Sequence, residues 1–205
     1  WAEAGARGLT VTACDRAACD IAEPGSVAAA FAEARPSVLI NCAAWTDVDG
    51  AEADEAGAAR VNADGPRVLA EACREHGVRL MHVSTDYVFA GDGTEPYPVD
   101  APIAPLNAYG RTKAAGERAI REVLGEDGTG DWIIARTAWL YDGTARNFLT
   151  TIARLAAERD RLEVVDDQRG RPTAAGELAR QLLELAVRPD ARGIFHCCND
   201  GEATW

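Results

Sequence analysis

Short apolar runs alternate with helix-period segments along the whole chain. Six continuous apolar runs predict strands, and five longer segments with apolar residues at helical spacing predict helices. The expected strands are residues 9–13, 38–41, 80–84, 132–137, 162–165 and 193–197. The expected helices are residues 26–34 with Ser26 as N-cap, 66–76 closed by Gly77, and about 106–124, 147–159 and 174–187.

This alternation predicts an α/β fold. Continuous hydrophobic strands joined by helices favour a doubly wound, mostly parallel, Rossmann-like sheet that is covered on both faces. In such sheets ligands bind beyond the carboxyl ends of the strands. Polar or small residues follow four expected strands, at Asp15, 41–44, 84–86 and 136–139. We therefore expect these four segments to meet in one crevice.

Composition and charge narrow the class of partner. The 205 residues carry a formal net charge of −12, which argues against nucleic acid or an anionic membrane surface and favours a small molecule. No apolar run approaches the roughly 20 residues of a membrane span. The six cysteines lack zinc-ligand spacing, so we expect a reducing, cytoplasmic compartment. His76, His82 and His196 are isolated in the sequence, so we predict structural roles for them and no catalytic metal.

Lys113 is the only lysine of the chain, among 21 lysines and arginines. It follows Tyr109 by four residues, which places both side chains on one face of a helix. An ammonium near a phenol favours the phenolate and lowers the phenol pKa from about 10. Tyr109 would then act as a general acid or base. The alternative is a solvated lysine beside a packed tyrosine, and this spacing alone does not decide between them.

Several separated motifs resemble one known family. Ser84 and Thr85 end the strand before the Tyr109 helix, so that hydroxyl, phenol and ammonium can meet. The motifs are HVSTDYVF at 82–89, YGRTKAAGE at 109–117, RPSVLINCAAWTDVD at 35–49, RTAWLY at 136–141, NF at 147–148 and DQRGRPT at 167–173. In this order they resemble the dTDP-4-dehydrorhamnose reductase family of extended short-chain dehydrogenase/reductases, over nearly the whole chain.

The resemblance implies reduction of the C4 ketone of a nucleotide-activated 6-deoxysugar, first of all dTDP-4-dehydro-L-rhamnose to dTDP-L-rhamnose, with NADPH or NADH. It implies Tyr109 as proton donor, Lys113 as its activator and nicotinamide-ribose ligand, and Thr85 as the hydroxyl that orients the substrate carbonyl. Asp86 and Trp139 match positions that line the sugar pocket. For Trp139 the alternative is a core aromatic.

The resemblance also implies a cofactor surface. Asp20 and Ile21 match an adenine-contacting pair. A segment that runs along the cofactor is matched by Ala43, Ala44, Trp45 and Thr46, with tight packing as the alternative for the two alanines. The Asp15 carboxylate would bond the ribose 2′-hydroxyl of NADH, whereas Arg16 would accept the 2′-phosphate of NADPH. These two signals oppose each other, and the habit of the family favours NADPH.

The sequence departs from the family pattern in three respects. The first strand and its Gly-rich GxxGxxG turn are missing, so we expect a fragment that lacks this turn and the C-terminal end. Trp45 stands where a tyrosine or smaller ring is common, and residues 140–144 on the sugar side are variable. We expect residues 1–140 to form the cofactor-binding domain, and residues 141–205 to contribute substrate-lobe elements interleaved with the last strands.

Other functions stay open. A non-catalytic, nucleotide-binding regulatory subunit would keep the fold, but it would not need Thr85, Tyr109 and Lys113 together. A related deoxysugar reductase of natural-product biosynthesis fits the same residues. An epimerase or dehydratase is disfavoured, because a dehydratase ordinarily has an acidic pair after the hydroxyl and here Tyr87 follows Asp86. The expected partner is the nucleotide-sugar substrate, and a homodimer is left open.

Overall fold

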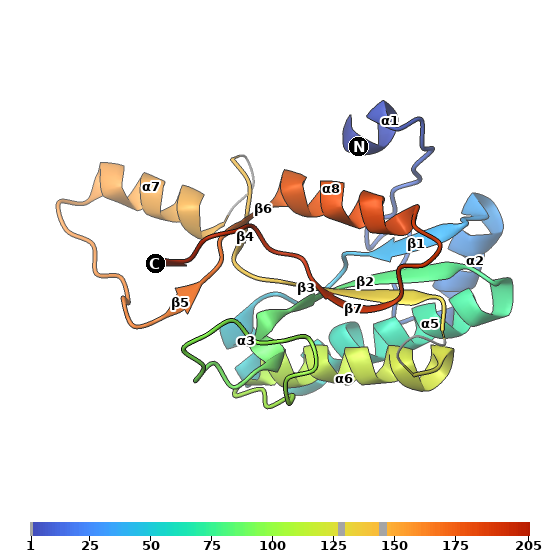
Figure 1. Cartoon of the computed structure of the whole chain (residues 1–205), viewed down its shortest axis with the longest axis horizontal. Coiled ribbons are helices and arrows are strands. Elements are labelled where there is room, and N and C mark those ends of the chain that lie inside the picture. Colours follow the sequence, from blue (N-terminus) through green and yellow to red (C-terminus); the bar gives the residue numbers. More distant parts are fainter. Residues whose placement is uncertain (1, 127–129, 144–146) are drawn as a thin grey trace.

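A computed structural model describes residues 2–126, 130–143 and 147–205, and a parallel four-stranded sheet lies at its centre (Figure 1). The strand order is β1-β2-β3-β7. These strands are β1 (Val38–Asn41), β2 (Arg79–Thr85), β3 (Trp132–Thr137) and β7 (Gly193–His196). Helices α5 (Gly65–His76) and α6 (Ala108–Leu124) cover one face, and α8 (Ala175–Ala186) lies on the other (Figure 1). This arrangement confirms the predicted α/β fold.

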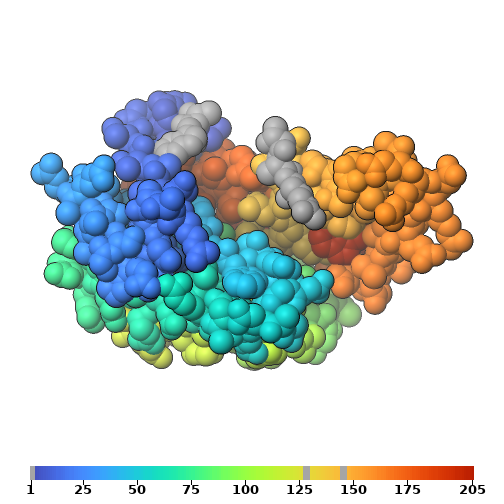
Figure 2. All heavy atoms as spheres, turned by 180° about the vertical axis from the view of Figure 1, so that it is seen from behind, coloured from blue at the N-terminus to red at the C-terminus, as the bar shows by residue number. Residues whose placement is uncertain are grey.

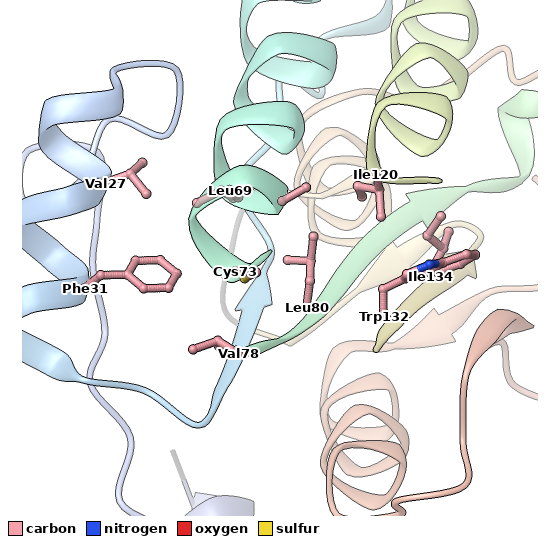
Figure 3. Close-up of a cluster of buried hydrophobic side chains, with 10 residues drawn as sticks. Val27, Phe31, Leu69, Cys73, Val78, Leu80, Ile120, Trp132 and Ile134 are labelled. Carbon is pink, nitrogen blue, oxygen red and sulfur yellow. The ribbon is translucent and has the colours of Figure 1, made fainter. Parts of the chain in front are cut away.

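Both faces of the sheet are buried, which explains why its strands read as continuous apolar runs. Leu80 and Ile134 point toward α5 and α6, where they meet Leu69 and Ile120 (Figure 3). On this side α2 (Pro24–Ala34) adds Val27 and Phe31 to the cluster. The alternate strand residues, and the α8 side chains that they meet, form the opposite core: Met81, Ile133, Ala135, Leu178 and Leu182.

Two predicted strands are wrong. Residues 9–13 and 162–165 have no strand conformation, and Leu9, Val11 and Val165 are exposed. A strand forms only where a neighbour takes up its backbone N–H and C=O groups. Within the described parts of the chain no strand pairs with either segment. Apolar composition alone therefore does not make these segments strands.

The five predicted helices are present, with small shifts at their ends. Gly77 closes α5 with φ 65°, as predicted. The predicted N-cap Ser26 is wrong, because α2 begins at Pro24 after Glu23. The Ser26 hydroxyl instead accepts a hydrogen bond from the Asp20 backbone N–H (3.0 Å). Helix α7 (Phe148–Glu158) begins after an Asn147 capping box.

Several short elements were not predicted, because they are too short to show a period. Between β1 and α5 lie α3 (Val48–Ala53), α4 (Glu55–Ala59) and the π-helical turn η1 (Arg60–Asp64). The others are α1 (Ala2–Ala6), the 3₁₀ turn η2 (Asp86–Val88), and the two-residue strands β4 (Leu140–Tyr141), β5 (Arg169–Gly170), β6 (Thr173–Ala174) and β8 (Ala203–Thr204). Strand β4 pairs with β6, and β5 pairs with β8.

Helix α7 stands apart from the sheet. Seen from behind, α7 and the residues after it form a lobe on the side away from the N-terminal segment (Figure 2). No residue of α7 is buried, and Phe148 and Leu149 are exposed. In the part of the chain that the structure describes, no helix has the length and apolar character to cross a membrane.

Candidate active site

The candidate site lies at the carboxyl end of β2, where Thr85 ends the strand. The Thr85 hydroxyl donates to Asp86 Oδ1 (3.0 Å) and accepts from the Tyr87 backbone N–H (3.2 Å). Tyr109, the second residue of α6, places its phenol near enough to the Thr85 hydroxyl for Thr85 to act on the pKa of the phenol. The structure thus brings together Thr85, Asp86 and Tyr109, as predicted from sequence.

Close packing of α6 against its surroundings places the phenol there. Asn107 caps the helix by accepting from the Gly110 backbone N–H (2.8 Å). A Cβ at residue 110 would lie 2.2 Å from the Tyr87 carbonyl oxygen, and one at residue 116 would lie 2.2 Å from the Asn62 carbonyl oxygen. Only glycine permits such an approach, so these two residues set the depth at which α6 sits.

The Tyr109 phenol is held in its protonated form. Burial raises its pKa to about 12, and the nearby Asp86 carboxylate adds to the rise, while the contact with the Thr85 hydroxyl opposes it. Its ring meets the edge of the Tyr87 ring with centroids 5.5 Å apart. A protonated phenol is the form that a proton donor requires at neutral pH.

Lys113, one turn further along α6, is directed at β2. Its side chain is buried, with 2% exposed, and Nζ donates to the Val83 carbonyl oxygen (2.7 Å) and contacts His82 Nε2 (3.2 Å). Burial lowers the pKa of Lys113 to about 8, with the Glu117 carboxylate acting in the opposite direction. The expectation that Lys113 lowers the pKa of Tyr109 is therefore wrong for this structure, because burial of the phenol dominates and the amine is engaged at the strand.

His82 belongs to the same site, although the sequence reading took it as isolated. Its ring is fully buried, and Nδ1 lies 3.0 Å from the Asn41 side-chain nitrogen. Burial, and next the charge of Lys113, hold the pKa of His82 well below its ordinary value. The signal that could have found it is the alternation of Leu80, His82 and Ser84 along one face of β2.

A buried ion pair fastens α6 to the sheet. Glu117 accepts from Arg136 Nη2 (2.7 Å) and Nε (3.0 Å), and from the Ser84 hydroxyl (2.6 Å). Arg136 Nη1 also donates to the Val99 carbonyl oxygen (2.9 Å), which ties in the segment after η2. Only 2% of the Arg136 side chain and 5% of the Glu117 side chain is exposed.

The segment after β1 presents small residues beside the site. Ala43 is exposed and Ala44 half-buried. The Trp45 backbone is fixed by Asn62, whose Oδ1 accepts from the Trp45 N–H (2.9 Å) and whose amide donates to the Trp45 carbonyl (3.1 Å). Sequence reasoning missed Asn62, which also donates to the Thr112 hydroxyl (3.1 Å) and so joins this segment to α6. Thr46, next in the segment, is exposed.

The predicted adenine-side residues lie on a loop. Asp15 follows an unpaired segment rather than a strand, and its Oδ1 accepts from the Ala18 N–H (2.9 Å). Asp20 forms long ion pairs with Arg60 (3.7 Å) and Arg16 (3.9 Å). Ile21 packs on the α2 and α5 core, where a Cβ at Gly65 would lie 2.6 Å from its Cδ1. The predicted position of Asp15 at a strand end is therefore wrong in this structure.

The strand ends fit a polar ligand that carries its own donors and acceptors. Thr137, which is paired in register with Thr85, ends β3 with a buried hydroxyl oxygen for which the described residues supply no partner. The exposed Ala43 and half-buried Ala44 follow β1 at the same edge of the sheet. No group of three or more histidine, cysteine or acidic side chains that could hold a metal is present among the described residues.

Trp139 lies at the base of the lobe. It has a left-handed backbone with φ 45°, and its ring stacks on Trp205 with centroids 3.6 Å apart. Gly170 approaches the ring so closely that a Cβ there would lie 2.4 Å from Trp139 Cε2. Phe148 adds a tilted contact to Trp205. Trp139 thus belongs to a small aromatic cluster at the beginning of α7.

Comparisons with known proteins agree with one another. The family model described as the RmlD substrate binding domain matches residues 2–205. The chain is 48% identical over 203 residues to a dTDP-4-dehydrorhamnose reductase of Streptomyces griseus, covering 97% of this chain and 66% of the relative. It is also 48% identical over 201 residues to a dTDP-4-keto-6-deoxy-D-glucose reductase of Streptomyces niveus, covering 97% of this chain and 68% of that relative. The chain thus spans about two thirds of the length of these relatives.

Solved structures are similar as well. A dTDP-4-dehydrorhamnose reductase from Bacillus anthracis in complex with NADP superposes with a TM-score of 0.90 at 36% identity, covering 98% of this chain and 69% of that one. One from Clostridium acetobutylicum gives a TM-score of 0.92 at 37% identity, covering 100% of this chain and 70% of that one.

Proposed function

Because this chain belongs to the RmlD substrate binding domain family of dTDP-4-dehydrorhamnose reductases, we propose that it carries the ketone-reducing centre of such an enzyme. The proposed reaction converts dTDP-4-dehydro-L-rhamnose to dTDP-L-rhamnose. The observation that carries the proposal is that the Tyr109 phenol lies beside Thr85 and Tyr87 at the end of β2.

Thr85 and Tyr109 would act on the ketone oxygen of the sugar. The Thr85 hydroxyl orients this oxygen, and the Tyr109 phenol donates its proton as the oxygen becomes an alkoxide. The raised pKa of Tyr109 keeps that proton in place at neutral pH, and an alkoxide is a strong enough base to remove it. In this structure the Thr85 hydroxyl gives its one proton to Asp86, so it must turn from Asp86 to the ketone oxygen when the sugar binds.

NADPH, when bound, supplies the hydride that adds to C4 of the sugar. We assign its adenine side to Asp15, Asp20 and Ile21. Along the cofactor we assign the segment Ala43, Ala44, Trp45 and Thr46, and at the nicotinamide ribose we assign Lys113. Arg16 is largely exposed, and among the described residues it has only a long ion pair, so it is available to a 2′-phosphate. The NADP complex of the Bacillus anthracis relative supports the same choice.

The identity of the sugar is decided on the lobe side. Besides the two relatives above, a probable dTDP-4,6-dihydroxy-2-methyloxan-3-one 4-ketoreductase of Streptomyces antibioticus is also 48% identical, so equal identity accompanies three different substrate names. We assign Asp86 to the polar edge of the sugar and Trp139 to its apolar side. Of the variable stretch 140–144, Thr144 lies outside the described residues.

The test is turnover of the purified protein with defined sugars. dTDP-4-keto-6-deoxyglucose is supplied with and without a 3,5-epimerase, and loss of the reduced nicotinamide absorbance is followed with NADPH and, separately, NADH. Consumption of NADPH only with the epimerase supports the rhamnose-forming reaction. Consumption without it assigns a different deoxysugar reductase. Binding of NADPH without consumption on either sugar would favour the regulatory function.

A further inference from the structure

A continuous chain of hydrogen bonds crosses from β1 to α6 beneath the proposed site. The Ala43 backbone N–H donates to Asn41 Oδ1 (3.0 Å), and the Asn41 amide nitrogen lies 3.0 Å from His82 Nδ1. His82 Nε2 lies 3.2 Å from Lys113 Nζ, which donates to the Val83 carbonyl oxygen (2.7 Å). The side chains of Asn41, His82 and Lys113 are all buried.

The direction of this chain is fixed at its first member. A backbone N–H can only donate, so the Asn41 oxygen must face Ala43 and the Asn41 nitrogen must face His82. The amide nitrogen carries two protons and can only donate, which leaves His82 Nδ1 as the acceptor. A neutral imidazole that accepts at Nδ1 carries its proton on Nε2. His82 therefore presents an N–H to Lys113.

Only one protonation state of Lys113 completes the network. An ammonium has three donors and no lone pair, so it cannot accept from His82. A neutral amine accepts the His82 N–H on its lone pair and still donates to Val83. Buried polar groups without partners are costly, so this network favours the neutral amine over the ammonium.

We propose that Asn41 and His82 are positioning residues that favour the neutral amine of Lys113, so that this amine gives up its proton at a lower pH than an ordinary lysine does. The proposal deepens the proposed function, because it concerns the partner of Tyr109, but it can be tested without turnover. The lowering of the pKa of Lys113 to about 8, chiefly by burial, agrees with it.

The other charged or titratable groups near Lys113 do not cancel the preference for the neutral amine. Glu117 lies one turn along α6 and raises the pKa of Lys113, but its carboxylate is already paired with Arg136. Cys42, which follows β1, also acts to raise it. Burial outweighs both, so His82 remains the neighbour whose proton position decides the hydrogen-bond pattern at Nζ.

The single lysine makes the test direct. Protein labelled with ¹³C and ¹⁵N only in lysine gives one side-chain signal, whose pH titration reports Lys113, and Lys113→Arg confirms the assignment by removing it. We expect a wild-type pKa near 8. In His82→Gln the amide oxygen can accept from an ammonium, so the pKa should rise by about one unit. The matched control His76→Gln changes an exposed histidine and should leave it unmoved. A folded His82→Gln protein with an unchanged Lys113 pKa would overturn the proposal.

A second measurement needs no stable variant at residue 82. The ring ¹⁵N shifts of the histidines in the wild-type protein distinguish the two neutral tautomers, and His82 is recognised as the ring that stays neutral to the lowest pH. We expect the proton on Nε2. A proton on Nδ1 would contradict the proposal, whatever the protein does with a nucleotide sugar. The Lys113 titration and the His82 tautomer are measured on the protein without substrate. Failure of the reductase assay would therefore not affect either result.

Discussion

The end of β2 and the α7 lobe both carry polar and charged side chains, which are buried at β2 and exposed on α7. Around Thr85 the polar groups are buried and bonded to partners from three strands and a helix. Helix α7 buries no residue, and its ion pair between Arg154 and Glu158 has 60% and 53% of the two side chains exposed. Packing fixes the first region before a ligand arrives, so we infer that the sheet sets the reaction and the lobe selects the sugar.

The largest expected effect is on turnover, and it comes from removing the phenol oxygen of Tyr109 at the end of β2. Tyr109→Phe keeps the ring that packs on Tyr87 but removes the proton donor. We expect turnover to fall about a thousandfold, as for loss of a general acid, with an unchanged melting temperature. The matched change Tyr97→Phe removes a hydroxyl that bonds Asp92 at an exposed position and should leave turnover near wild type. If both variants turn over at the same rate, Tyr109 is not the acid.

Buried and exposed ion pairs should differ sharply in stability. Glu117→Gln leaves the buried Arg136 guanidinium without its carboxylate, so we expect about 3–5 kcal/mol lower free energy of unfolding in denaturant titration. Glu158→Gln at the exposed pair should cost less than about 0.5 kcal/mol. An equal loss of unfolding free energy in the two variants would mean that the buried pair stabilises the protein no more than the exposed one.

The buried amine predicts a particular pH dependence. The folded-state pKa of Lys113 is lowered to about 8 from 10.5, so between these values the unfolded chain binds the extra proton and stability rises with pH. Over this window the gain approaches about 3 kcal/mol. Lys113→Met removes the group, so the difference between wild-type and variant unfolding curves isolates it from the cysteines. A difference that stays flat from pH 7 to 11 would mean that Lys113 titrates normally.

The smallest effect is expected at the lobe. Trp139→Ala should raise the Michaelis constant for the nucleotide sugar about tenfold, because the proposed sugar site then loses an aromatic side chain. Cofactor affinity, measured by calorimetry, should be unchanged. The stack on Trp205 suggests the alternative outcome. Unchanged sugar binding with a lower melting temperature would make Trp139 a structural residue of the lobe.

Local apolar patterns predicted the strands correctly where the segment is part of the central sheet. The strand at 132–137 has the predicted bounds, because both of its faces are buried and it pairs with β2 on one side and β7 on the other. The run at 9–13 has similar composition but no pairing strand in the described chain. Pairing is a property of distant segments, so composition could not separate these two cases.

For the candidate site too, local patterns predicted some residues, whereas others depend on long-range contacts. The spacing of Tyr109 and Lys113 predicted a shared helix, and Thr85 was predicted at the end of its strand. Asn41 and His82 are 41 residues apart, and Asn62 bonds partners 17 and 50 residues away, so no local pattern could join them. The pKa of Tyr109 depends on burial, which spacing does not report. The division near residue 140 and a homodimer stay predictions.

The most direct test of the account follows the hydride itself. The protein is incubated with NADPH that carries deuterium at the transferable position of the nicotinamide, together with dTDP-4-dehydro-L-rhamnose, and the product is examined by NMR. The account predicts one deuterium at C4 of the sugar, and almost none with Tyr109→Phe over the same time. Deuterium at another carbon, or label that stays on the nicotinamide with the wild-type protein, would contradict it.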